Sequence, residues 1–161
     1  MAQAKSGDKS KPDTVEIHKV NFNLVNYQVG SKVDLEGVSK KDLKVLSVKF
    51  GDLTGDGKDE AVVHVSWSFA RYGGSGYGYF VDLFTIKDNA LTFLIRLDGG
   101  GKSSEFQIKL LEIKDNHVVV KRCEINNLDG EQFLATIAYE WNGERLIEIQ
   151  RQRVKSENCW G

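Results

Sequence analysis

An acidic segment between residues 50 and 63 carries the side chains of this chain that best suit metal chemistry. Asp52, Thr54 and Asp56 alternate along it, Gly57 follows, and Glu60 ends the set. Hard cations such as Ca²⁺ take about six to eight oxygen ligands, which a tight loop supplies by turning alternate side chains toward one centre. Glycine suits the sharp turn at position 57 because it adopts positive φ without a steric clash. The spacing therefore indicates a weak calcium-binding loop.

The last ligand distinguishes two kinds of calcium loop. An EF-hand closes on a bidentate glutamate at its twelfth position, which here is Val63, and an aliphatic side chain cannot ligate. The run that starts with Phe50-Gly51-Asp52 instead resembles the calcium loops of FG-GAP repeats in integrin-type propellers, which also join two strands. This resemblance departs at Thr54 and Glu60, where the repeat has a stronger oxygen ligand and an aspartate. It implies a Ca²⁺ site made by the side chains of Asp52, Thr54, Asp56 and Glu60 and the carbonyl of Lys58.

The same residues also suit a turn that holds no metal. Asp52 and Asp56 can accept hydrogen bonds from nearby backbone N–H groups, as aspartates do in Asx-turns. Gly55 and Gly57 would then supply the unusual φ values. The sequence leaves both interpretations open.

A second candidate site lies in the glycine-rich and aromatic segment at residues 70 to 80. Small flexible residues that display tyrosine and arginine are typical of protein-recognition loops, because tyrosine buries a large area at modest entropic cost. The alternative is a long hairpin connection whose tyrosines pack on the sheet. The residues expected to contact a partner are Arg71, Tyr72, Ser75, Gly76, Tyr77 and Tyr79.

Two further resemblances concern the location and the partner. The run from Ser75 to Tyr79 is similar to the Ser-Gly-x-x-Tyr element of bacterial periplasmic lysozyme inhibitors, which implies a loop that enters the lysozyme cleft. The order of Phe22, Tyr27, the acidic segment and the glycine-rich run 73–76 resembles a group of small exported bacterial proteins. This similarity implies a periplasmic or secreted location, and Ala2-Gln3-Ala4 looks like the remains of a signal-peptidase site.

The two cysteines, Cys123 and Cys159, permit a single disulfide bond. Such a bond would attach the segment around Cys159 to a predicted strand, and an oxidising compartment would favour it. The alternative is a pair of free thiols. A zinc site is not indicated, because no third or fourth ligand stands near either cysteine.

Alternation of apolar and polar residues dominates after residue 45, which is the period of two expected of half-buried strands. His64 points away from the apolar stripe of its predicted strand, so we expect it to face solvent. Hairpin turns are predicted at Asp88-Asn89, Asp115-Asn116 and Asn142-Gly143, of which Asn-Gly is the strongest type I′ signal. The predicted strands are residues 16–27, 44–50, 60–69, 78–86, 91–98, 105–113, 117–125, 132–141 and 145–154.

The predicted fold class is all-β, an antiparallel meander of about eight or nine strands that forms a small barrel or a two-sheet sandwich. Residues 1–14 are polar and are predicted to be a disordered lead, and residues 15–161 form one domain. A single short helical turn is expected near residues 39–43.

Charge and hydropathy restrict the class of partner. The chain has 22 Lys plus Arg against 23 Asp plus Glu, a formal net charge of -1, so no basic surface for nucleic acid is expected. No apolar run approaches the length of about 18 residues that a membrane span needs. No catalytic residue is assigned, because no serine, cysteine or histidine stands in the context of an activated nucleophile.

The sequence therefore predicts a non-catalytic exported bacterial binding domain, with a hairpin that Ca²⁺ stabilises and a partner that is another protein or a cell-envelope component. A lysozyme inhibitor that acts through residues 73–80 is the first alternative. The second alternative is a small hydrolase whose carboxylates pair only in space.

Overall fold

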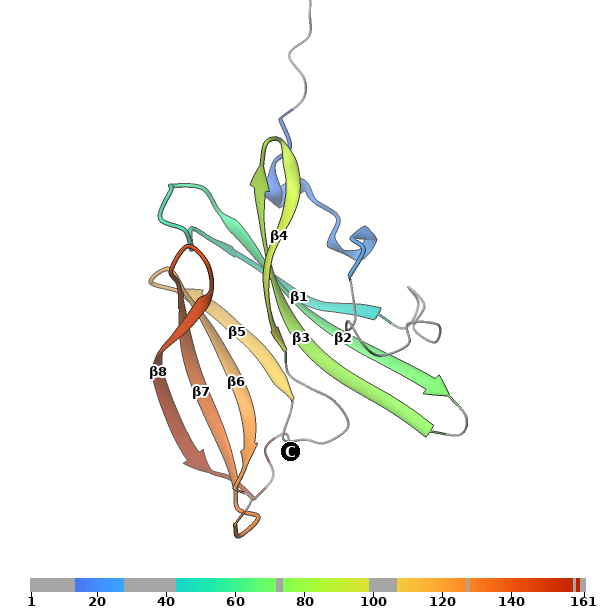
Figure 1. Ribbon diagram of the computed structural model, residues 1–161, viewed down its shortest axis with the longest axis vertical. Coiled ribbons are helices and arrows are strands. Elements are labelled where there is room, and N and C mark those ends of the chain that lie inside the picture. Colours follow the sequence, from blue (N-terminus) through green and yellow to red (C-terminus); the bar gives the residue numbers. More distant parts are fainter. Residues whose placement is uncertain are drawn as a thin grey trace, which may run out of the picture.

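The computed structural model describes residues 14–27, 43–71, 74–98, 107–126, 128–157 and 159. It contains two four-stranded antiparallel sheets, each with its strands in chain order (Figure 1). The first sheet consists of β1 (Leu43–Gly51), β2 (Glu60–Arg71), β3 (Gly74–Lys87) and β4 (Ala90–Asp98). The second sheet consists of β5 (Ile108–Lys114), β6 (His117–Ile125), β7 (Gln132–Trp141) and β8 (Leu146–Lys155). The all-β prediction is confirmed, and the fold is a two-sheet sandwich rather than a closed barrel.

The tight turns lie where the sequence predicts them. Asp88-Asn89 and Asp115-Asn116 each have φ values of 50° and 61°, the left-handed pair that a two-residue type I′ turn requires. At Asn142-Gly143 only the glycine has positive φ, and the flanking residues pair as Trp141↔Leu146. The strongest sequence signal for a type I′ turn therefore marks a longer loop, in which the Asn142 side chain accepts hydrogen bonds from the backbone N–H groups of Glu144 and Arg145.

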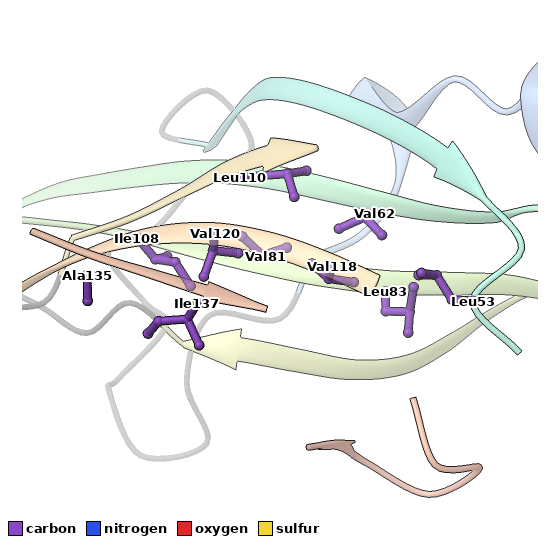
Figure 2. Packing of buried hydrophobic residues seen from close by; sticks show 10 residues of the cluster. All are labelled: Leu53, Val62, Val81, Leu83, Ile108, Leu110, Val118, Val120, Ala135 and Ile137. Atoms are coloured by element: carbon purple, nitrogen blue, oxygen red, sulfur yellow. The ribbon is translucent and has the colours of Figure 1, made fainter. Parts of the chain in front are cut away.

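The main core lies between the two sheets. Apolar side chains on the facing surfaces of both sheets are almost completely removed from water, which is the dominant favourable term in folding. Figure 2 shows these side chains between the ribbons: Leu53, Val62, Val81, Leu83, Ile108, Leu110, Val118, Val120, Ala135 and Ile137.

The other face of the first sheet is covered by the segment before β1. This segment forms two short 3₁₀ turns, η1 (Ile17–Lys19) and η2 (Phe22–Leu24), which place Ile17 and Phe22 against the sheet. The prediction of a strand at residues 16–27 is therefore wrong. The Asn21 side chain accepts a hydrogen bond from the Asn23 backbone N–H, and this local bond favours a turn over an extended strand.

Because both faces are covered, β2 is buried on both sides from Glu60 to Val65. His64 is only 5% exposed, so the prediction that it faces solvent is wrong. Val63 and Val65 pack toward Ile17 and Phe22, whereas His64 faces the second sheet. The short helical turn expected near residues 39–43 lies almost wholly outside the described residues, and Leu43 begins β1.

A buried ion pair joins β3 to β4. Asp82 and Arg96 are direct partners across the two strands, and the guanidinium binds both carboxylate oxygens, at 2.6 and 2.7 Å. Asp82 is 1% exposed, and the guanidinium also stacks on the Phe80 ring, 3.6 Å from its centre. Bidentate pairing of this kind compensates a carboxylate that has lost its water.

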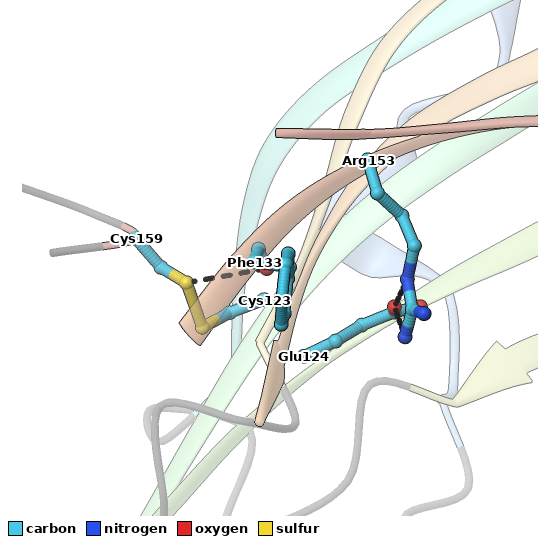
Figure 3. The surroundings of a disulfide bond; sticks show 5 residues. All are labelled: Cys123, Glu124, Phe133, Arg153 and Cys159. Atoms are coloured by element: carbon cyan, nitrogen blue, oxygen red, sulfur yellow. Dashed lines mark hydrogen bonds and ion pairs between the residues drawn. A yellow bond between two sulfur atoms is a disulfide. The ribbon is translucent and has the colours of Figure 1, made fainter. Parts of the chain in front are cut away.

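A disulfide bond joins Cys123 in β6 to Cys159, with the two Cα atoms 5.6 Å apart. Cys123 is fully buried, and the Cys159 sulfur lies 3.5 Å from the carbonyl oxygen of Phe133 in β7 (Figure 3). On the neighbouring strand positions, Arg153 of β8 pairs with Glu124 of β6 at 2.6 Å. The bond thus attaches the segment after β8 to the middle of the second sheet.

Replacing both cysteines, Cys123→Ala with Cys159→Ala, is expected to lower the free energy of unfolding by about 2–4 kcal/mol, because the bond closes a long loop in the unfolded chain. Urea unfolding of the wild type with and without reductant measures this. The double variant is the control, since reductant should leave its unfolding midpoint unchanged. Equal midpoints for oxidised and reduced wild type would contradict a structural role for the bond.

Candidate functional site

The acidic hairpin joins β1 to β2, and Glu60 at its end points into the fold. This carboxylate is 1% exposed and accepts hydrogen bonds from the backbone N–H groups of Leu53 at 2.9 Å and Thr54 at 3.1 Å. The hydroxyls of Thr54 and Thr85 donate to its other oxygen, at 3.4 and 3.1 Å. Four donors therefore compensate the buried charge and connect the loop to β3.

The two aspartates of the loop hold its backbone. Asp52 accepts hydrogen bonds from the N–H groups of Gly55 at 2.7 Å and Gly57 at 2.9 Å, and Asp56 accepts one from Lys58 at 2.9 Å. Gly55 and Gly57 have φ values of 76° and 81°, a region that favours glycine. These hydrogen bonds are the ones expected of an Asx-turn that forms without a metal ion.

The oxygen ligands that the FG-GAP resemblance implies are thus engaged with the protein's own donors. Among the described residues, no group of three or more His, Cys, Asp or Glu side chains lies in an arrangement that could hold a metal ion. Binding of Ca²⁺ by Asp52, Asp56 and Glu60 together would require the Glu60 carboxylate to leave its four donors. Calcium binding at this loop stays a prediction.

Glu60→Gln is expected to lower the free energy of unfolding by about 2–3 kcal/mol. The glutamine amide has one acceptor oxygen where the carboxylate has two. Its NH₂ group would face the N–H and O–H donors that bind the carboxylate in the wild type. Thermal or urea unfolding measures the loss. The matched control is Glu112→Gln on β5, whose side chain is exposed and should change stability little. Similar stabilities of the two variants would show that Glu60 does not hold the loop.

The glycine-rich segment lies in an extended hairpin. The strand pairing of β1 with β2 ends at Leu43↔Trp67, and that of β3 with β4 ends at Phe80↔Asp98. Beyond these points and among the described residues, residues 68–71 of β2 pair only with β3, and residues 74–79 of β3 pair only with β2. This two-stranded arm, which we call the projecting hairpin, extends past the sandwich (Figure 1).

The predicted contact residues belong to this projecting hairpin or lie at its end. Tyr77 is 40% exposed, and its ring meets that of the half-buried Tyr79 edge-on with the centres 6.5 Å apart. Arg71, Ser75 and Gly76 lie in strands, and Tyr72 falls outside the described residues.

The connection predicted between the strands at 60–69 and 78–86 is therefore too long, because β2 runs to Arg71 and β3 begins at Gly74. Glycines of this segment sit opposite aromatic positions: Gly78 pairs with Trp67 and Gly76 pairs with Phe69. At Gly78, the aromatic side chain of Trp67 on the paired strand can compensate for the missing side chain.

A third group of polar residues, which the sequence analysis did not single out, lies between the sheets. Ser47 and His64 line a cleft of about 370 Å³ that Tyr79 and β5 also border. The Ser47 hydroxyl and the His64 Nε2 are buried and have no hydrogen-bond partner among the described residues. The available signal was a single histidine within the valine-rich run of β2, Val62-Val63-His64-Val65.

Burial lowers the pKa of the His64 imidazole, and the charge of Lys109 acts in the same direction. A hydrogen bond to the main chain of Ile108 opposes this shift. Because Nε2 is unpaired, the bond to Ile108 is made by Nδ1. The ring is therefore neutral at pH 7 with its proton on Nδ1.

The lowered pKa of His64 predicts a loss of stability in mild acid. The unfolded chain, in which a histidine has a pKa of 6.5, takes up the proton before the folded protein does. The stabilisation is complete above 6.5 and is lost as pH falls toward the folded pKa. The variant His64→Gln should lose less stability between pH 7 and pH 5 than the wild type, which melting curves at both values measure. An equal loss in both proteins would contradict the lowered pKa.

Comparison of the chain with models of protein families, with curated proteins and with solved structures finds no match in any of the three.

Proposed function

We propose that this protein is a non-catalytic binding domain that contacts a partner protein through the projecting hairpin. The observation that carries this proposal is that, within the described ranges of the chain, β2 and β3 extend beyond their pairing with β1 and β4. An isolated two-stranded hairpin is at best marginally stable in water, so an arm of this kind gives the fold little stability in return for its exposed surface. A contact with another molecule would explain why the fold includes this arm.

The projecting hairpin offers two kinds of contact. Tyr77 presents an exposed aromatic ring whose orientation is fixed by the edge-on contact with Tyr79, and rigid aromatic side chains dominate many interfaces. No other described strand pairs with the outer edges of residues 68–71 and 74–79, so an extended segment of a partner can pair with their main-chain N–H and C=O groups.

An extracellular or periplasmic location in a bacterium belongs to the same proposal. The disulfide bond between Cys123 and Cys159 supports it, because such bonds persist in oxidising compartments and are rare in the cytosol. In the part of the chain that the structure describes, no helix is long and apolar enough to cross a membrane. A cell-envelope protein is therefore the class of partner to test first.

Tyr77→Ala is expected to reduce capture of the partner from a cell-envelope extract by at least about tenfold, since truncation of an interface tyrosine commonly costs more than 1 kcal/mol. Immobilised wild type and variant are compared by quantitative mass spectrometry of the bound proteins. The matched control is Ile149→Ala on β8, which removes another exposed apolar side chain far along the chain from the hairpin. Equal capture by the wild type and Tyr77→Ala would remove the hairpin from the proposal.

The lysozyme-inhibitor alternative uses the same arm, because Ser75 to Tyr79 lie in the β3 half of the projecting hairpin. Cell-wall lysis by several purified lysozyme types, with and without the protein, tests this alternative separately. Inhibition by the wild type and not by Tyr77→Ala would identify a lysozyme as the partner. Unchanged rates for every lysozyme would reject this alternative and leave the envelope partner standing.

Calcium binding at the acidic hairpin predicts a rise in melting temperature with added Ca²⁺, because a ligand that binds only the native state stabilises that state. The stabilisation is about 1.4 kcal/mol when the free ligand is at ten times its dissociation constant. Melting curves in chelator and in millimolar Ca²⁺ measure the shift. Asp52→Asn should abolish it, whereas Asp115→Asn in the β5–β6 turn should preserve it. No shift in the wild type would reject the calcium site.

A further inference from the structure

The cleft beside β5 contains two buried polar atoms that lie next to each other and lack partners among the described residues. Ser47 of β1 and His64 of β2 are direct partners across the strand pair, so their side chains leave the same face of the sheet side by side. Both line the cavity of about 370 Å³. This volume lies within the range of cavities that take small organic molecules, roughly 300–1,000 Å³.

An unpaired buried polar atom is unfavourable, because it has lost its hydrogen bonds to water and has gained none in the protein. The two atoms in this cleft have complementary needs. The Nε2 atom of His64 carries a lone pair and needs a donor, since Nδ1 holds the ring proton, and the hydroxyl of Ser47 can donate. Both atoms are enclosed in this structure, so a hydroxyl group reaches them only when the side chains that enclose them move. Placed between them, that hydroxyl would donate to Nε2 and accept from Ser47, which would satisfy both.

The remaining lining residues indicate what else the ligand carries. The walls include the side chains of Leu46, Ile108 and Leu110, which favour an apolar body. Lys49 and Lys109 also line the cleft, and both residues are exposed. No aspartate or glutamate is among the described residues that line the cleft, so its charge favours an anion.

We propose that this cleft binds a small hydroxycarboxylate with an apolar body, whose hydroxyl group bridges Ser47 and His64 and whose carboxylate pairs with Lys49 and Lys109. The proposal does not use Tyr77, although the cleft and the projecting hairpin share Tyr79, whose ring lies 5.9 Å from that of His64. It differs from a trapped water, which could satisfy the same two atoms without using the lysines or the apolar walls.

Three probes that share a benzene ring separate these contributions. Mandelate carries both the hydroxyl and the carboxylate, phenylacetate lacks the hydroxyl, and benzyl alcohol lacks the carboxylate. Protein labelled with ¹⁵N in its histidines reports on the site directly, because the Nε2 resonance of His64 shifts when this atom accepts a hydrogen bond. Mandelate should shift this resonance saturably, and each of the other two probes should bind about tenfold more weakly.

Matched variants assign the contacts. Ser47→Ala should weaken mandelate to the level of phenylacetate without lowering the melting temperature, since it removes an unpaired hydroxyl. Its control is Ser68→Ala, an exposed serine of the same sheet. The double variant Lys49→Gln with Lys109→Gln should weaken mandelate to the level of benzyl alcohol, and Lys114→Gln on the same strand as Lys109 should not.

Several results would overturn the proposal. If mandelate leaves the Nε2 resonance unchanged, the occupant of the site is water. If phenylacetate binds as tightly as mandelate, or Ser47→Ala binds mandelate as well as the wild type does, no hydroxyl bridge exists. If benzyl alcohol matches mandelate, the lysines do not select an anion.

Discussion

Most of this structure depends on one constraint, which is that the first sheet is apolar on both faces and both must be covered. From Glu60 to Val65 every residue of β2 is buried. The second sheet covers one face, and Ile17 and Phe22 from the segment before β1 cover the other. Because neither side of this stretch is left for water, each polar group that falls within it has to find a partner inside the protein.

The buried polar groups of the first sheet meet this requirement in different ways. Glu60 is surrounded by four donors and Asp82 by a bidentate guanidinium, so both stabilise local structure. One ring nitrogen of His64 has a hydrogen-bond partner, whereas its Nε2 atom and the neighbouring Ser47 hydroxyl have none among the described residues. Complete satisfaction is what a structural role requires, and a buried group that the protein leaves unsatisfied is a place for a water, an ion or a ligand. This contrast is what separates the cleft from the acidic hairpin.

Local patterns in the sequence were sufficient for the strands and turns of the sandwich but not for its layers. Alternation placed β1 to β8, and Asp-Asn pairs placed two type I′ turns, because both signals act over a few residues. The strand predicted at 16–27 failed because the Asn21 side chain provides a local alternative that periodicity does not register. The prediction that His64 is exposed was wrong because alternation tells only which residues share a face of the sheet. The number of faces that become buried depends on what packs on the sheet. The unpaired atoms in the cleft arise from that packing, so no sequence motif marks them.

The chain order of the strands has a consequence for how the protein acquires its fold. Each of the eight described strands pairs with the one just before or after it, so every hairpin closes a short loop at small entropic cost. Topologies built from such neighbouring contacts form their sheets early compared with those that need distant pairings. Docking of the two meanders then becomes the step that brings remote segments together. A newly synthesised first sheet that waits for this step still exposes the apolar face that the second sheet later covers, so dilution or a chaperone should raise the yield of folded protein.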